Sequence, residues 1–341
     1  MERKTLQVGA AVIACALLFR LLSGGVMETT VRALQQQKLA QIILFLETGR
    51  SVRLPEEESK EQPEETTPPP QEQTAETAAV IAENPEPANL AAAFSAEDAA
   101  RISLRNSSGF DVDTAAALAE PLAWNLTGEE PTVLILHTHS TESYVNAEGY
   151  KEAALYRTLD ENYNMISIGA RLAQSLTEKG ISVIHDRTLH DYPSYNGSYS
   201  NARETVLQYL EQYPSIALVL DLHRDAVTDK SGNQVGHSLA TDAGSAAKMM
   251  LVLGSHTAGL SHPNWRANFS VGVKLQAQLE KVQPGICRQL NLRASRFNQD
   301  LMPGMLLVEM GAAGNTRQEA LLSADILAQA IYDLAHGTIA G

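Results

Sequence analysis

The chain has little cysteine: Cys15 and Cys287 are the only two among 341 residues. Cys15 lies in an apolar N-terminal segment and Cys287 in the C-terminal half, so we do not expect the two to pair. This scarcity excludes a disulfide scaffold and a cysteine-rich zinc site. It is compatible with an extracytoplasmic location.

Signatures of several common functional classes are also absent. No basic stretch interleaved with aromatic residues occurs, which argues against a nucleic-acid partner. The chain has no Walker-type nucleotide motif. It has no G-x-S-x-G pattern either, so a serine hydrolase built on Ser140 or Ser143 is disfavoured.

The negative charge is concentrated in one segment. The whole chain carries a formal charge of −14, and residues 54–90 contain ten glutamates against one lysine, which gives −9. The same residues hold seven of the 14 prolines. Because such a composition cannot bury a core, residues 54–90 are predicted to form an extended, self-repelling, disordered linker.

The N-terminal segment has the character of a membrane anchor. Residues 6–26 are largely apolar, and about 20 such residues can span a bilayer as a helix. Arg3 and Lys4 favour a cytoplasmic N-terminus, and the lack of an A-x-A cleavage site favours a retained transmembrane helix within residues 1–27. Residues 28–53 carry apolar side chains at helical spacings and predict a helical juxtamembrane segment. We therefore expect a single-pass cell-membrane protein with an extracytoplasmic catalytic domain.

The C-terminal part has the pattern of a folded domain. Residues 91–130 are interpreted as a bridging region with short helices, and residues 131–341 as the catalytic domain. Strands are expected at residues 133–136, 181–184, 216–222, 249–253, 290–294 and 305–310, with helices at 162–179, 201–213, 264–282 and 316–336. Strands that alternate with helices predict an α/β domain with a mainly parallel sheet flanked by helices.

Three of the expected strands run into polar residues that suit a metal site. His223 follows the third strand and Glu309 belongs to the last, while the first is followed by His137-Thr138-His139-Ser140-Thr141-Glu142. Parallel strands bring their carboxyl ends to one edge of a sheet, where sites commonly form. Two imidazoles and a carboxylate are ligands that catalytic zinc accepts, with one position left open for water.

We accordingly assign His137, Glu142 and His223 as zinc ligands and Glu309 as general base and proton shuttle. His139 lies two residues from His137, so the two would share a face if the strand continued. One of them is enough for the metal. The other then has a supporting role or binds the tetrahedral intermediate, and the pattern alone leaves this choice open.

Several segments together resemble a known family. These are residues 135–144 (ILHTHSTESY), 219–226 (VLDLHRDA), 296–301 (RFNQDL), 307–311 (LVEMG) and Asn315-Thr316. In combination they resemble the stage II sporulation protein P family, from about Pro131 to the C-terminus. The preceding anchor and linker agree with that layout.

The resemblance implies a zinc-dependent peptidoglycan hydrolase of endospore-forming bacteria, with a domain similar to the N-acetylmuramoyl-L-alanine amidases. It implies a His–Glu–His zinc site, amidase cleavage between muramic acid and the stem peptide, and endopeptidase cleavage of peptide cross-links. The setting would be engulfment, at the mother-cell membrane facing the septal or engulfment space. The partners would be stage II sporulation proteins D and M, besides the glycan and its stem peptides.

One departure concerns Glu142, which follows the first histidine more closely than in the general zinc amidases. A catalytically inactive wall-binding scaffold is the alternative function. The presence of both Glu142 and Glu309 argues against it, because loss of the base is the simplest route to inactivity.

Further residues are candidates for substrate binding. Arg224 and Arg296 offer guanidinium groups to stem-peptide carboxylates, and Asn298 and Gln299 offer side-chain amides. A surface or strand-capping role is equally open for each. Residues 191–200 are expected to form a long loop that either overhangs the site or simply connects two elements, with tyrosines at Tyr192, Tyr195 and Tyr199.

Overall fold

The computed structural model describes residues 94–337 apart from 123, 146–155 and 258–259. The chain divides into two compact units, Met1–Val80 and Ile81–Gly341, and the described residues all belong to the second. The expected membrane anchor, juxtamembrane helix and acidic linker lie outside the described residues. Among the helices of the described part, none combines the length and the apolar character needed to cross a membrane.

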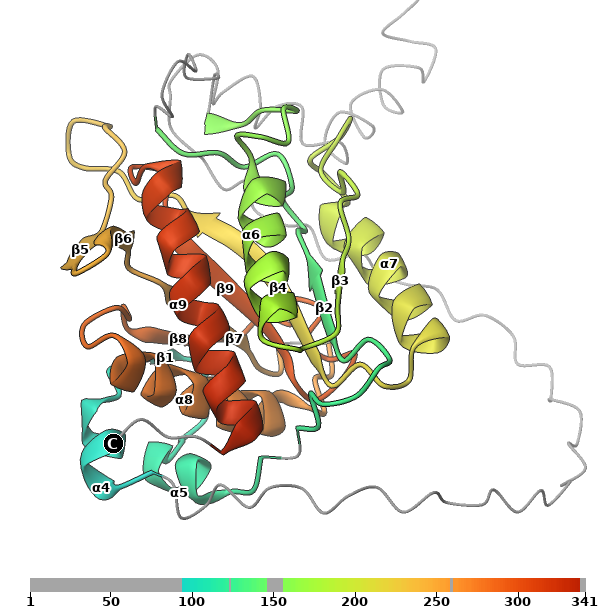
Figure 1. The fold of residues 1–341 in the computed structure, drawn as a ribbon, viewed down its shortest axis with the longest axis vertical. Coiled ribbons are helices and arrows are strands. Elements are labelled where there is room, and N and C mark those ends of the chain that lie inside the picture. The colour runs from blue at the N-terminus through green and yellow to red at the C-terminus, as the bar shows by residue number, and fades with distance from the viewer. Residues whose placement is uncertain (1–93, 123, 146–155, 258–259, 338–341) are drawn as a thin grey trace, which may run out of the picture. The chain divides into compact units, whose positions relative to one another are not determined.

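A seven-stranded sheet forms the centre of the described unit, with the order β1-β8-β7-β9-β4-β2-β3 (Figure 1). Its strands are β1 (Leu104–Ser107), β2 (Val133–Leu136), β3 (Val183–His185), β4 (Leu218–Asp225), β7 (Met250–Gly254), β8 (Leu290–Arg293) and β9 (Met305–Ala312). Neighbouring strands run parallel, except that β7 and β9 are antiparallel. The predicted α/β fold with a mainly parallel sheet flanked by helices is confirmed.

Helices cover both faces of this sheet. They are α4 (Ala96–Arg101), α5 (Thr114–Ala119), α6 (Met165–Glu178), α7 (Ser198–Gln212), α8 (Trp265–Val282) and α9 (Arg317–His336). Leu218 and Leu220 of β4 share a core cluster with residues of α6, α8 and α9, whereas Val219 between them packs with residues of α7. The alternation is that of a strand buried on both sides. It defines an α6 face and an α7 face of the sheet.

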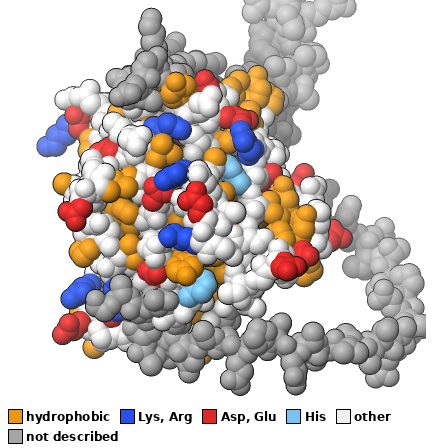
Figure 2. All heavy atoms as spheres, viewed as in Figure 1, with side chains coloured by type: hydrophobic (Ala, Val, Ile, Leu, Met, Phe, Trp, Pro, Cys, Tyr) orange, Lys and Arg blue, Asp and Glu red, His pale blue; other side chains and the backbone are white. Residues whose placement is uncertain are grey.

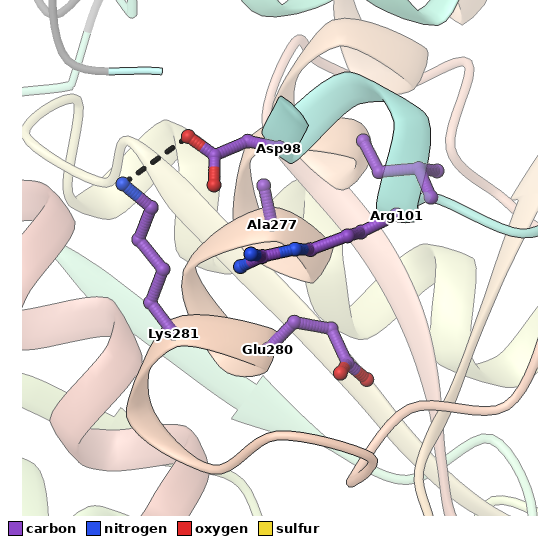
Figure 3. A pocket seen from close by; sticks show the side chains of 6 residues that line it. Asp98, Arg101, Ala277, Glu280 and Lys281 are labelled. Carbon is purple, nitrogen blue, oxygen red and sulfur yellow. Dashed lines mark ion pairs between the residues drawn. The ribbon is translucent and has the colours of Figure 1, made fainter. Parts of the chain in front are cut away.

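Part of the region at 91–130 is integrated with the domain that follows it. β1 pairs with β8 at the edge of the sheet. Asp98 of α4 forms an ion pair of 3.2 Å with Lys281 of α8 (Figure 3). Lys274 of α8 is fully buried and donates its Nζ hydrogens to the Ala117 carbonyl of α5 and to Ser270. Residues on both sides of position 130 therefore contribute to one core.

Two local features differ from the expected pattern. A small hairpin of β5 (Ser238–Thr241) and β6 (Gly244–Ala247) was not predicted, because its short strands lack an apolar period. Helix α9 begins one residue later than expected, because Thr316 is its N-cap: the Thr316 hydroxyl accepts from the backbone of Glu319, whose carboxylate accepts from the backbone of Thr316. Capping boxes of this kind satisfy two otherwise unpaired N–H groups.

The face of the described unit shown in Figure 2 carries side chains of both charges. In Figure 2, basic and acidic side chains are interspersed over the face shown, and neither sign forms a continuous field.

Candidate active site

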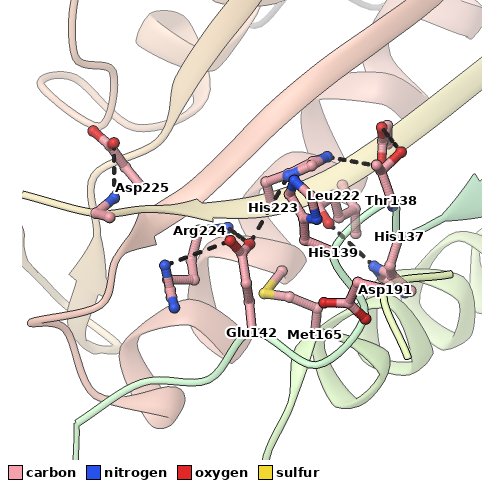
Figure 4. A network of polar contacts seen from close by, with 12 residues as sticks. His137, Thr138, His139, Glu142, Met165, Asp191, Leu222, His223, Arg224 and Asp225 are labelled. Atoms are coloured by element: carbon pink, nitrogen blue, oxygen red, sulfur yellow. Dashed lines mark hydrogen bonds and ion pairs between the residues drawn. The ribbon is translucent and has the colours of Figure 1, made fainter. Parts of the chain in front are cut away.

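The carboxyl ends of β2, β4 and β9 bring together polar side chains that are distant in the sequence. His139 and Glu142 lie on the loop after β2, and His223 lies on β4 (Figure 4). The rings of His139 and His223 are 5.2 Å apart between centroids and nearly perpendicular. Glu142 Oε2 is 3.8 Å from His223 Nδ1. Glu309 of β9 is the register partner of His223, so the two side chains leave the same face of the sheet.

Strand alternation explains why His223 and Glu309 lie on the α7 face. His223 is an even number of residues from Val219, which packs with α7 residues. Glu309 is likewise an even number of residues from Met305 of β9, and Met305 packs in the same cluster as Val219. The site therefore forms on the side of the sheet from which α7 and its preceding loop approach.

His137 lies on the opposite face. It is two residues from Ile135, so the two side chains leave the same face of the strand, and Ile135 belongs to the core beneath α6. The ring is fully buried, with Nδ1 3.2 Å from the Leu222 carbonyl and Nε2 2.9 Å from His185 Nε2. A Cβ at Gly169 of α6 would come within 2.5 Å of both histidine Nε2 atoms, so this position needs glycine. Both ring nitrogens of His137 have partners away from Glu142, so the structure does not bring this expected ligand together with Glu142.

His139 has the free nitrogen that a ligand needs. Its Nδ1 is buried and has no hydrogen-bond partner within the described part of the chain, while Nε2 lies 3.1 Å from the hydroxyl of Tyr195. Burial lowers the pKa of His139 to about 4. The ring is therefore neutral at physiological pH, which is the form that binds metals.

Arginines hold the carboxylate of Glu142. Arg157 Nη2 donates to Oε1 at 3.2 Å, and the backbone N–H of Arg224 donates to Oε2 at 3.2 Å. The guanidinium of Arg224 lies farther from Oε1, at 3.5 Å. These contacts fix Glu142 and compensate its charge, so that Oε2 remains turned towards His223.

The outer nitrogen of His223 contacts a second carboxylate. Nε2 lies 2.9 Å from Asp221 Oδ1, although the direction of approach is not that of a hydrogen bond. Asp221 is itself fixed by Thr138, whose backbone N–H and hydroxyl donate to it at 2.8 and 2.6 Å. Burial lowers the pKa of His223, but Asp221, Glu142 and Glu309 outweigh burial and raise it to about 9.

The types of residue present fit a zinc ion. His139, Glu142 and His223 offer two imidazoles and a carboxylate, and the unpartnered Nδ1 of His139 is a buried polar atom that a cation would satisfy. Two ligands of a tetrahedral zinc ion are roughly 3.4 Å apart, slightly less than the 3.8 Å between His223 and Glu142. In the described residues, no three His, Cys, Asp or Glu side chains are already placed to hold a metal ion.

Glu309 is the most perturbed acid of the site. Its Oε2 is buried without a hydrogen-bond partner among the described residues. Burial raises the pKa of Glu309 to about 8, with a contribution from the nearby charge of Glu142, while His223 acts in the opposite direction. A buried carboxyl whose pKa lies near neutrality is suited to accept and return a proton.

The raised pKa of Glu309 predicts a pH-dependent effect on stability. The unfolded chain ionises this group near its ordinary pKa of 4.5 and the folded chain only near 8, so the folded state holds the extra proton in between. The contribution of Glu309 to the free energy of unfolding is then fully present below pH 4.5 and declines by up to about 1.4 kcal/mol per pH unit towards pH 8. Glu309→Gln should lack this decline. Urea unfolding of the metal-free full chain at pH 5 and pH 7.5 measures the difference, and equal pH dependence of both proteins would contradict the prediction.

The residues assigned to substrate binding mostly have internal roles. Arg224 is buried and donates to Glu142 and to the carbonyls of Ser143 and Tyr156. Gln299 is fully buried, and its amide donates to the Val252 carbonyl and accepts from the Gly254 N–H.

Asn298 donates to the carbonyl of Tyr199 and thereby holds the first turn of α7. Arg296 contacts Asp300 at 3.5 Å and is about one-third exposed, so it alone of these assigned residues offers its guanidinium to solvent. Arg224, Asn298 and Gln299 thus all make hydrogen bonds to other protein groups.

Sequence reasoning missed two supporting residues of the site. Asp221 precedes His223 by two residues on a buried strand, and this spacing places both side chains on one face, so the pattern could have identified it. The residues around Arg157 in the sequence give no indication that its side chain forms a hydrogen bond with Glu142.

Comparisons with known proteins add the family. An N-acetylmuramyl-L-alanine amidase, Ami1, from Mycobacterium smegmatis has a TM-score of 0.38 and 13% identity, over 63% of this chain and 100% of the other. An N-acetylmuramoyl-L-alanine amidase from Clostridium difficile 630 has a TM-score of 0.35 and 15% identity, over 62% and 97% of the two chains.

Stage II sporulation protein P of Bacillus subtilis (strain 168) is 27% identical over 226 residues, which are 61% of this chain and 53% of that protein. The chain thus matches about half the length of this curated relative. The family model of stage II sporulation protein P matches residues 33–332, which include His139, Glu142, His223 and Glu309. Since this match spans most of the sequence, the chain belongs to the stage II sporulation protein P family.

Proposed function

We propose that this protein is a zinc-dependent peptidoglycan hydrolase that acts as an N-acetylmuramoyl-L-alanine amidase and as an endopeptidase on peptide cross-links. The observation that supports this function is the grouping of His139, Glu142, His223 and Glu309 at one edge of the sheet. Within that group, His139 Nδ1 and Glu309 Oε2 are buried without partners in the described chain. Membership of the sporulation family supplies the expected substrate.

The proposed roles follow from the contacts. His139, Glu142 and His223 hold the zinc ion, which when bound supplies a Lewis acid for the substrate amide. Glu309 takes a proton from the attacking water and delivers it to the departing amine nitrogen. Arg224 keeps the carboxylate of Glu142 turned towards His223.

The proposal extends to the cell. Residues 1–27 anchor the chain in the cell membrane, and the acidic linker at 54–90 holds the catalytic domain at a distance on the extracytoplasmic side. Membership of the family supports a role in engulfment during sporulation, for which stage II sporulation proteins D and M are the proposed partners. Peptidoglycan glycan and stem peptides are the substrate.

A serine mechanism has less support. The hydroxyl of Ser140 is fully buried and donates to the carbonyls of His137 and Thr188 at 2.9 and 2.8 Å. Its proton is therefore directed into the protein and not towards a histidine base.

Metal removal provides the test of the proposed function. The purified full chain should release material from purified peptidoglycan, lose this activity with a chelator, and regain it with zinc but not with magnesium. Mass spectrometry of the products separates the two reactions: free lactyl groups on muramic acid report amidase cleavage, and new amino ends within stem peptides report endopeptidase cleavage. Activity that persists in chelator would refute the zinc mechanism. Binding to peptidoglycan without any released product would instead support the inactive scaffold.

A further inference from the structure

The loop between β3 and α7 is fastened beside the candidate site. Asp191, in the middle of the loop, is buried and accepts hydrogen bonds from the Thr141 hydroxyl and from Arg157, each at 2.6 Å. Directly after the loop, in the first turn of α7, the Tyr199 carbonyl accepts a hydrogen bond from Asn298 at 2.7 Å. Thr141 directly precedes Glu142, so the loop is attached to the segment that carries the proposed ligands.

Tyr195 extends from this loop onto His139. The two rings stack with centroids 4.5 Å apart and an interplanar angle of 12°. The Tyr195 hydroxyl lies 3.1 Å from His139 Nε2, and the Arg157 guanidinium lies 4.7 Å from the centre of the tyrosine ring. Tyr195 is nevertheless 54% exposed, so the hydrophobic core does not explain its placement.

The tautomer of His139 decides which of its two nitrogens can face a metal. When Nε2–H donates to the Tyr195 hydroxyl, the lone pair resides on Nδ1, the buried atom without a partner among the described residues. Metal-binding histidines almost always donate their other N–H to a fixed partner, which sets the tautomer and the ring orientation.

The ring of His223 is oriented in a similar way, although its outer nitrogen makes an ion-pair contact and not a hydrogen bond. Its Nε2 contacts Asp221 at 2.9 Å, and its Nδ1 is the nitrogen closest to the carboxylate of Glu142. Both imidazoles therefore present Nδ1 inwards and keep Nε2 on an outer partner. For His223 that partner comes from its own strand, whereas for His139 it comes from the loop before α7.

We infer that Tyr195 is a positioning residue, whose hydroxyl holds His139 Nε2 and directs Nδ1 towards the zinc ion of the proposed function. The inference rests on that function and adds a residue that the ligand motif does not contain. It also couples the conformation of the loop before α7 to metal affinity. The competing geometry has the opposite consequence: if Nε2 were the coordinating atom, the Tyr195 hydroxyl would block it, and removing the hydroxyl would tighten zinc binding.

The test compares zinc affinity in Tyr195→Phe, Tyr195→Ala and Tyr192→Phe, measured in the full chain by competition with a chromophoric chelator. Tyr192 belongs to the same loop and is 53% exposed, which makes it a matched control for loss of a hydroxyl. Tyr195→Phe should weaken zinc binding about 10–100-fold, the usual effect of losing an outer partner of a ligand, with an unchanged unfolding midpoint. Tyr192→Phe should bind as the wild type does.

The outcomes distinguish this inference from the proposed function. Unchanged or tighter binding in Tyr195→Phe overturns the role of the hydroxyl. Weaker binding in Tyr195→Ala alone also overturns it, because the effect would then come from ring stacking. A wild-type chain that binds no zinc removes the proposed function, and the inference falls with it.

Discussion

Replacing Glu309 by glutamine is expected to lower kcat on peptidoglycan by about 10²–10⁴-fold, the range that a positioned general base supplies, while zinc remains bound. Glutamine keeps the size of the side chain and a carbonyl oxygen, but it cannot accept and return a proton at neutral pH. Because Glu309 lies beside His223 in the strand register without being a proposed ligand, the metal content should not change.

The electrostatics of the site support this role for Glu309. Burial holds its pKa near 8 in the metal-free chain, and a cation held nearby would favour the ionised form. The carboxylate is then available as a base without salt-bridge partners to restrain it, since its Oε2 has no hydrogen bond within the described chain. The neutral amide of Glu309→Gln removes this property without adding bulk.

The experiment needs both turnover and metal content. Glu161→Gln is a suitable control, because it makes the same change on a side chain that is 41% exposed and pairs with Arg187. The control should keep wild-type activity and zinc. Full activity in Glu309→Gln would show that another group moves the proton, and loss of zinc together with activity would make Glu309 a ligand instead of a base.

Hydrophobic periodicity was enough to predict most of the fold. β2 has the bounds that its apolar run predicts, and α8 begins within one residue of the expected position. β1, β5 and β6 were missed because their short, partly exposed sequences have no periodic apolar face. Such strands are specified by the neighbours with which they pair, which a local pattern does not contain.

The site was predicted less completely, because the sequence does not show on which face of the sheet each side chain lies. The sequence located His223 and Glu309 at the sheet edge, but the choice between His137 and His139 was left open. His137 continues the alternation of Val133 and Ile135, whose side chains belong to the core beneath α6. Deciding the question needs the face on which His223 lies, and that depends on how β2 and β4 pair. The pairing of the strands, and not local spacing, therefore determines which of the two histidines lies near Glu142 and His223.

This assignment predicts opposite behaviour for the two histidines. His139→Ala should weaken zinc binding by more than the roughly 100-fold that loss of an outer partner can cost, because a direct ligand is removed. The free energy of unfolding should fall less than in His137→Ala, because Nδ1 has no partner in the described structure and Tyr195, the partner of Nε2, is half-exposed. Zinc affinity by chelator competition and unfolding by urea are measured on the same full-chain preparations.

His137→Ala should show the reverse pattern. Its removal leaves His185 Nε2 and the Leu222 carbonyl without their partner in the interior beneath α6, where each unsatisfied polar group costs about 1–3 kcal/mol. The free energy of unfolding should fall accordingly, while the molecules that remain folded bind zinc within a few-fold of the wild type. Loss of zinc in His137→Ala with retention in His139→Ala would restore His137 as the ligand. That outcome would require the His137 side chain to lie on the α7 face of the sheet, on the same side as Glu142.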